Sequence, residues 1–291
     1  ERGHYSNRGE VVGRASPAVL PPFPQGEPIN RLGLAKWLTS SDHPLMARVT
    51  VNRYWQMIFG SGLVSTSEDF GMQGTPPTHP ELLDWLARDF INSGWNMHHL
   101  LKKMVLSHTY RQESKILKSA LEEDPENLLL SRAPAYRLPA EMIRDGLLAH
   151  SGLLHKKTGG PGAKPYDLKV SFKPINPDGA PNVYRRSVYT FWKRTAPTPV
   201  MMAMDASKRD VCTVRRERTE SPSQSLIMLN GTQFVEAARA NADALVQTHG
   251  TNNPTLLIED AFRSLTSRKP TDMEREILLQ LLEEQKAHFQ D

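Results

Sequence analysis

A near absence of cysteine is the first constraint in this sequence. Cys212 is the only cysteine in 291 residues, which excludes an intramolecular disulfide, a thiolate zinc cage and a CxxCH haem attachment within the chain. Cys212 lies in DVCTVRRER, and we expect its side chain to be a small buried apolar group. The sequence therefore predicts no cofactor held by this chain.

Long apolar runs are also missing. No stretch approaches the roughly 20 residues that a membrane-spanning helix requires, so no such segment is predicted. The first residues, ERGHYSNRGEVVG, contain no apolar signal core. We expect the chain to be a fragment or a processed piece whose targeting information lies elsewhere.

Familiar catalytic and metal-binding motifs are lacking as well. The sequence contains no HExxH and no GxSxG, and GGPG at 159–162 is not followed by the Lys-Ser/Thr of a phosphate-binding loop. His98 and His99 are adjacent, so on a helix they point in different directions, and His150 and His155 miss the i, i+4 spacing. No metal site is predicted, and no catalytic residue can be named.

Helical patterns dominate what is present. Residues 1–30 are rich in proline and are expected to form an arm, 31–155 a helical core and 220–291 further helices. Capping boxes are predicted at 78–81, 221–224 and 271–274, and Gly60 is expected to end a helix. The fold class is mainly α, an irregular helical globule with one structural domain overall.

Residues 156–219 differ from the rest of the chain. This insert is rich in glycine, proline and lysine and has no helical period, and we expect it to pack on the core. Within it, RRSVYTFWKR is β-branched and aromatic enough to predict a short strand.

The positive charge of the chain is concentrated in this insert. Nine of the residues from 184 to 220 are basic and four are acidic, whereas the whole chain has a net charge of only +4. Basic side chains among aromatic rings could bind an anionic glycan or small molecule, or could instead tie the insert to acidic groups of the helical body. The modest overall charge disfavours a nucleic-acid partner. The candidate ligand-binding residues are Arg185, Arg186, Trp192, Asp205, Arg215 and Arg216.

Two sets of polar residues lie within helical patterns. Asn52 and Arg53 interrupt the apolar run ARVTVNRYWQMIFGSGLV, and buried amide or guanidinium groups must be paired. Glu141, Arg144 and Asp145 continue a charged stripe that begins at Arg137 in RLPAEMIRDGLL. We predict that Asn52 and Arg53 bind the insert or this stripe and so form a polar core. The members of that core are Asn52, Arg53, Glu141, Arg144 and Asp145.

Long stretches resemble a known family. NRLGLAKWLTSSDHPLMARVTVNRYWQ and YRRSVYTFWKRTAPTPVMMAMDASKRDVCTVRRERTESPSQSLIMLN are similar to the C-terminal "PSD-one" domain of planctomycete and verrucomicrobial proteins. The N-terminal part of those proteins carries a c-type cytochrome domain. The similarity runs from Glu1 to about Leu245. The resemblance implies a periplasmic or cell-envelope location, haem c on another domain, that domain as a partner and a link to polysaccharide utilisation. It supplies no established reaction.

Three hypotheses on function follow. The first is an accessory domain that contacts an anionic glycan or the other domains of the parent protein through its arginines. The second is an enzyme acting on glycans or their oxidised products, with acid–base work by Glu141, Asp145, Asp205 and His108. The third is a purely structural module that docks a partner.

Overall fold

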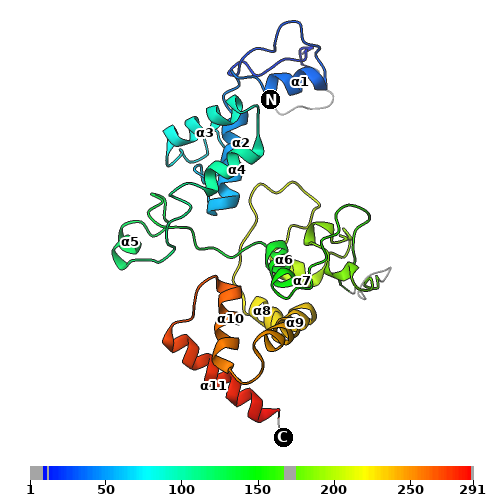
Figure 1. Ribbon diagram of the computed structural model, residues 1–291. Helices are drawn as coiled ribbons and strands as arrows, with labels where there is room; N and C mark the ends of the chain where they lie inside the picture. The colour runs from blue at the N-terminus through cyan, green and yellow to red at the C-terminus, as the bar shows by residue number, and fades with distance from the viewer. Residues whose placement is uncertain (1–8, 12, 167–174, 290–291) are drawn as a thin grey trace. The chain divides into compact units, whose positions relative to one another are not determined.

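The computed structural model describes residues 9–11, 13–166 and 175–289 (Figure 1). Over those ranges the chain forms eleven α-helices and two 3-10 turns, with isolated bridges in place of any sheet. The predicted mainly α fold is therefore confirmed. None of these helices combines the length and apolar character needed to cross a bilayer.

The chain divides into two compact units, Glu1–Tyr136 and Arg137–Asp291. The division lies inside the range 31–155 that the sequence analysis treated as one core. It falls there because α6, at Ala140–His150, packs on α9 and on the 3-10 turn η2 rather than continuing the first bundle.

Unit 1 is built on three mutually packed helices, α2, α3 and α4. Apolar side chains at helical spacing, such as Val51 and Trp55 on α2 or Leu86 and Phe90 on α3, meet in one buried cluster. Burial of each such side chain contributes roughly 1.5–3 kcal/mol, and this is the main stabilising term of the unit. The helices of unit 1 are α1 at Arg31–Leu38, α2 at Met46–Phe59, α3 at Pro80–Asn92, α4 at Met97–Val105 and α5 at Lys118–Glu123.

Unit 2 is a chain of neighbouring helices joined to a long irregular segment. α6 contacts α9, which in turn contacts α8 and α10, and α10 contacts α11. A small core of Ala140, Met201, Met204 and Ala206 joins α6 to α7. The other elements are η1 at Asn182–Tyr184, η2 at Ser187–Tyr189, α7 at Pro199–Ala203, α8 at Pro222–Asn230, α9 at Thr232–His249, α10 at Pro254–Thr266 and α11 at Asp272–His288.

The predicted short strand in RRSVYTFWKR is wrong. In its place lies the 3-10 turn η2, shortly after η1, and in the described residues only single bridges pair His155 with Arg185 and Ala163 with Thr190. The segment opposite contains Gly159, Gly160 and Pro161. A proline has no amide hydrogen to donate, and glycine weakens a strand, so a continuous ladder does not form.

The helix-capping predictions are partly correct. Side chain and backbone bond reciprocally in the boxes at 221–224 and 271–274, and Gly60 ends α2 at a φ of 86°. The box predicted at 78–81 is wrong, because Pro80 takes the first helical position and makes His79 the N-cap. The Thr78 hydroxyl instead donates to the carbonyl oxygen of Leu63 at 3.3 Å.

Asn52 and Arg53 have opposite environments. Asn52 has no exposed surface, and its amide nitrogen donates to the Val64 carbonyl at 3.0 Å and the Ser67 hydroxyl at 3.1 Å. Its amide oxygen accepts the Val64 N–H at 2.9 Å. Asn52 thus holds the loop that follows α2, in the same unit, and the prediction that it binds the insert or the α6 stripe is corrected. Arg53 is exposed, so its place in a polar core is also wrong.

We predict that Asn52→Ala lowers the stability of unit 1 by about 3 kcal/mol. The substitution leaves the buried N–H and carbonyl of Val64 without partners and opens a small cavity. Arg53→Ala, one residue along the helix, should change stability by less than about 0.5 kcal/mol. Urea denaturation followed by tryptophan fluorescence measures both, and equal losses in the two variants would contradict the burial pattern.

Candidate functional site

The charged stripe of α6 fastens the segment 183–219 to the helix. Arg144 is 2% exposed and lies at its centre. Its Nε donates to Gln233 Oε1 at 2.8 Å, and its Nη atoms donate to the carbonyls of Arg185 at 2.9 Å and Val183 at 2.6 Å. A fourth bond reaches the Ser187 hydroxyl at 3.2 Å. The planar fork of one buried guanidinium therefore joins α6, α9 and the turns η1 and η2.

The two acidic members of the stripe bind the same segment. Asp145 Oδ1 accepts the backbone N–H of Ser187 at 2.7 Å, and its other oxygen lies 3.6 Å from Arg186 Nε. One turn earlier, Glu141 Oε2 pairs with Arg216 Nη1 at 2.6 Å. Acids of α6 thus hold arginines of the insert, as one of the sequence alternatives anticipated.

Arg185 and Arg186 are neighbours with different roles. Arg185 is 4% exposed, donates to the carbonyls of Gly159 and Pro161, and stacks 4.1 Å from the ring of Tyr189. Its guanidinium therefore closes the irregular segment from inside, and its role as a ligand-binding residue stays a prediction. The side chain of Arg186 is 62% exposed and faces solvent.

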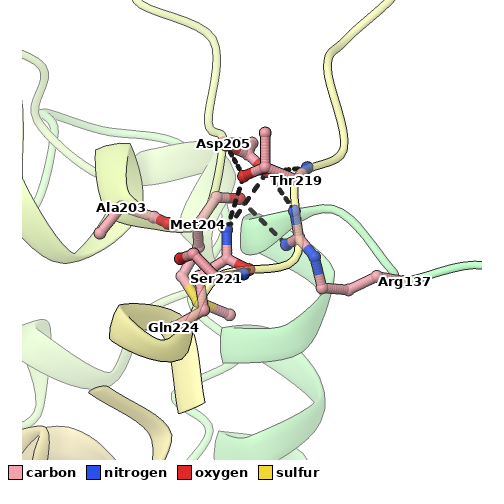
Figure 2. Close-up of polar contacts among 7 residues, drawn as sticks. All are labelled: Arg137, Ala203, Met204, Asp205, Thr219, Ser221 and Gln224. Carbon is pink, nitrogen blue, oxygen red and sulfur yellow. Dashed lines mark hydrogen bonds and ion pairs between the residues drawn. The ribbon is translucent and has the colours of Figure 1, made fainter. Parts of the chain in front are cut away.

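Asp205 closes a second junction, shown in Figure 2. Its carboxylate pairs with Arg137 and accepts the N–H of Thr219 at 2.7 Å and the Thr219 hydroxyl at 2.9 Å. Gln224 Nε2 lies 3.3 Å from the same carboxylate, and Arg137 also donates to the Met204 carbonyl at 3.2 Å. Asp205 has a φ of 60°, a conformation that aspartate tolerates better than most residues.

This carboxylate is held in its charged form. Burial alone would raise the pKa of Asp205, but the hydrogen bonds from Thr219, the charge of Arg137 and the Gln224 amide outweigh it. The pKa of Asp205 therefore lies below its usual value. Since these partners are groups of the protein itself, Asp205 acts as a structural anchor, and its role as a ligand-binding residue stays a prediction.

The Asp205–Thr219 contact joins the two ends of an exposed loop. We call residues 206–218, between α7 and α8, the basic loop (Figure 1). At its start, Trp192 Nε1 donates to the Lys208 carbonyl at 2.8 Å, and the guanidinium of Arg209 stacks 4.8 Å from the Trp192 ring. The loop carries five basic side chains, Lys208, Arg209, Arg215, Arg216 and Arg218, against the acids Asp210 and Glu217.

Two residues singled out in the sequence, Cys212 and Trp192, lie in or against the basic loop. Cys212 is exposed rather than buried, because the loop projects from the helices and offers no apolar cover. Trp192 supports the base of the loop with one edge while its ring takes part in the Arg209 stack. The sequence analysis did not identify Thr219 and Gln224 as partners of Asp205. The capping box at 221–224 already marked Gln224 as an anchored side chain, but nothing in the pattern linked it to Asp205.

The proposed acid–base residues are divided between the two units. In unit 2, Glu141, Asp145 and Asp205 face different arginines and different backbone partners. His108 belongs to unit 1. Across the described ranges, no cluster of three or more His, Cys, Asp or Glu side chains is arranged to hold a metal ion.

We predict opposite outcomes for two neighbouring arginines. Arg185→Ala should lower the melting temperature of unit 2 by several degrees, since it removes the carbonyl bonds that hold residues 157–161. Arg186→Ala should leave the melting temperature within about 1 °C because the side chain is largely in solvent. Differential scanning calorimetry of both variants measures this, and an unchanged Arg185→Ala transition would contradict the buried role.

We also predict that the Asp205 contact has a defined pH dependence. A carboxylate whose pKa is lowered by folding stabilises the fold above its unfolded pKa of about 3.9 and loses that effect as pH falls through the lower folded value. Asp205→Asn should cost roughly 2 kcal/mol at pH 7, because Arg137 loses its charged partner, and the cost should shrink below about pH 4.

The same variant should open the basic loop to protease. At pH 7, trypsin should cut the Asp205→Asn loop several-fold faster than the wild-type loop, since its ends are no longer joined. The exposed Asp243 on α9 provides the control substitution Asp243→Asn, for which no change is expected. A cost that stays constant from pH 7 to pH 3, or equal cleavage of both loops, would count against the anchor.

Comparison with known proteins gives one match. A family model described as "PSD1: Protein of unknown function (DUF1553)" matches residues 30–282. No curated protein and no solved structure matches the chain. The family resemblance predicted from the motifs is therefore confirmed.

Proposed function

The chain belongs to the PSD1 family of proteins of unknown function, and we propose that it is an accessory domain that binds an anionic glycan through its basic loop. The proposed setting is a periplasmic or cell-envelope protein that carries haem c on a separate cytochrome domain, with that domain as the intramolecular partner. Both parts of this setting come from the family resemblance described above.

The closed, cationic and exposed loop carries the proposal. Five basic side chains lie within thirteen residues whose ends are joined by Asp205 and Thr219. A loop fixed at its base loses less conformational entropy on binding than a free chain. Arginine forks match the paired oxygens of sulfate and carboxylate groups, and a pattern of such groups is what a polyanionic glycan presents.

The exposed arginines, rather than the buried ones, define the proposed surface. Arg215 is exposed, whereas Arg209 stacks on Trp192 and Arg216 pairs with Glu141. Arg185 and Arg144 are buried and bond backbone and side-chain groups outside the basic loop, so they are not part of this surface. The enzyme and docking alternatives have no specific observation in their favour within the described residues.

We predict that the chain binds heparin, a sulfated glycan, and does so more weakly as salt rises. Surface charge contacts are screened over about 8–10 Å near physiological salt, so affinity should fall more than tenfold between roughly 50 and 500 mM NaCl. Isothermal titration calorimetry with heparin, polygalacturonate and neutral dextran measures this. Equal affinity, or equal lack of affinity, for all three glycans would remove the proposal.

Substitutions in the loop should map the contact. Arg215→Ala should weaken heparin binding about fivefold, the value of one exposed charge-assisted contact of roughly 1 kcal/mol. The control is Arg239→Ala, which removes the same charge from the exposed face of α9. If both variants weaken binding equally, the effect is one of net charge and the basic loop is not the binding surface.

A further inference from the structure

Unit 2 contains a cavity of about 350 Å³ beside the first turn of α9. It shares no residue with the basic loop, since none of its lining residues belongs to 206–218. Its walls come from the start of α9 and the preceding Gly231, from Val200 on α7 and from the irregular segment before α7. The residues used below are Tyr166, Asp178, Val183, Tyr184, Phe234 and Glu236.

The charge of this cavity is negative. Asp178 and Glu236 are the ionisable acids in its wall, and none of the residues that line it in the described part of the chain is Lys, Arg or His. The N-terminus of α9 contributes about half a positive charge. Behind the wall, the Arg144 guanidinium donates to Gln233 and Val183 and lies 5.8 Å from the Tyr166 ring. Arg144 is itself 3.8 Å from Asp145, so its charge is compensated there and does not balance the two carboxylates of the cavity. The cavity therefore disfavours anions and differs in this respect from the basic loop.

Each carboxylate is held in position by a neighbour. The Tyr184 hydroxyl donates to Glu236, and this bond, together with burial, raises the pKa of Tyr184, so the phenol keeps its proton. Asp178 accepts the backbone N–H of Lys164 at 3.0 Å and returns its own N–H to the Lys164 carbonyl at 2.9 Å. The two acids are thus oriented by the protein before any ligand arrives.

The rest of the wall is aromatic and aliphatic. Tyr166, Tyr184 and Phe234 contribute rings, and Val183 lies among them. Burial raises the pKa of Tyr166, and its ring therefore remains neutral at ordinary pH. Aromatic faces attract an organic cation, whereas they offer an inorganic ion little in exchange for its water.

We propose that this cavity binds a small organic cation, an ammonium group carried on a short apolar frame. Two carboxylates compensate the positive charge, the rings cover the alkyl groups, and the volume suits a molecule of that size. A neutral ligand would displace water from both carboxylates without replacing the lost interactions, which costs free energy. The proposal does not depend on glycan binding, because it concerns other residues and the opposite charge.

The expected affinity is modest. One cation–π contact and two partly solvated charge pairs are weak interactions, so we expect a dissociation constant of about 1 mM or weaker. The test titrates the whole chain with choline and, in parallel, with its neutral isostere 3,3-dimethylbutan-1-ol, and follows binding by NMR. Choline should bind at least about tenfold more tightly than the isostere, because only choline carries the charge.

Isosteric substitutions locate the site. Glu236→Gln and Asp178→Asn each remove one charge with little change of shape and should each weaken choline binding about fivefold or more. The matched control is Glu276→Gln on the exposed face of α11, which should leave choline affinity unchanged. An unchanged melting temperature in all three variants shows that the fold is intact.

Two sources could supply such a group, a free small molecule or a lysine side chain of another protein. Nα-acetyl-lysine amide serves as the second probe, and binding of either probe that is lost in Glu236→Gln supports the cavity. No binding of either probe at roughly 10 mM, equal binding of choline and its isostere, or an equal effect of Glu276→Gln would overturn it. Heparin binding by the same samples tests the basic loop separately, so failure of one proposal is distinguishable from failure of the other.

Discussion

A buried guanidinium that must be paired is the constraint on which unit 2 depends. Arg144 is almost without exposed surface and donates to groups on α9, η1 and η2. Leaving such a charge without partners in an apolar interior would cost several kcal/mol, so these segments are held where the fork requires them. The irregular segment that precedes α7 has little regular hydrogen bonding of its own, and this single side chain supplies three of its contacts.

Like Arg144, Arg185 is a buried arginine whose guanidinium bonds backbone carbonyls. Arg144 binds its carbonyl, and the Arg185 guanidinium in turn binds the carbonyls of Gly159 and Pro161. A glycine- and proline-rich stretch leaves many backbone carbonyls without a helix or strand partner, and arginine has enough donors to satisfy several of them at once. In this insert, arginine side chains therefore satisfy the backbone carbonyls that strand pairing satisfies in a β-sheet.

Asp205 converts an irregular connection into a closed loop. Its bonds to Thr219 bring together residues fourteen positions apart, and these bonds, together with the charge of Arg137, hold the carboxylate in its charged form. The entropy cost of closing such a loop rises only slowly with length, so one partly buried ion pair with its hydrogen bonds is sufficient. The result is a projecting segment of positive charge in the same unit as a cavity lined by Asp178 and Glu236. The two features would attract ligands of opposite sign.

Much of the local structure could be predicted from the sequence alone. The mainly α fold, the end of α2 at Gly60, the boxes at 221–224 and 271–274 and the concentration of charge in the insert all follow from short-range patterns. Each depends on residues within about one helical turn of one another, so no knowledge of the tertiary structure is needed.

Only the tertiary structure decided which polar groups are inside. Asn52 is buried and Arg53 exposed, and Arg185 is buried beside an exposed Arg186, although the residues of each pair are adjacent in the sequence. On a helix or turn, adjacent side chains point in different directions, and the direction that becomes interior is set by elements distant in the chain. For the same reason, composition and spacing revealed the charge of the basic loop, whereas its closure by Asp205, Thr219 and Gln224 required the fold that brings them together.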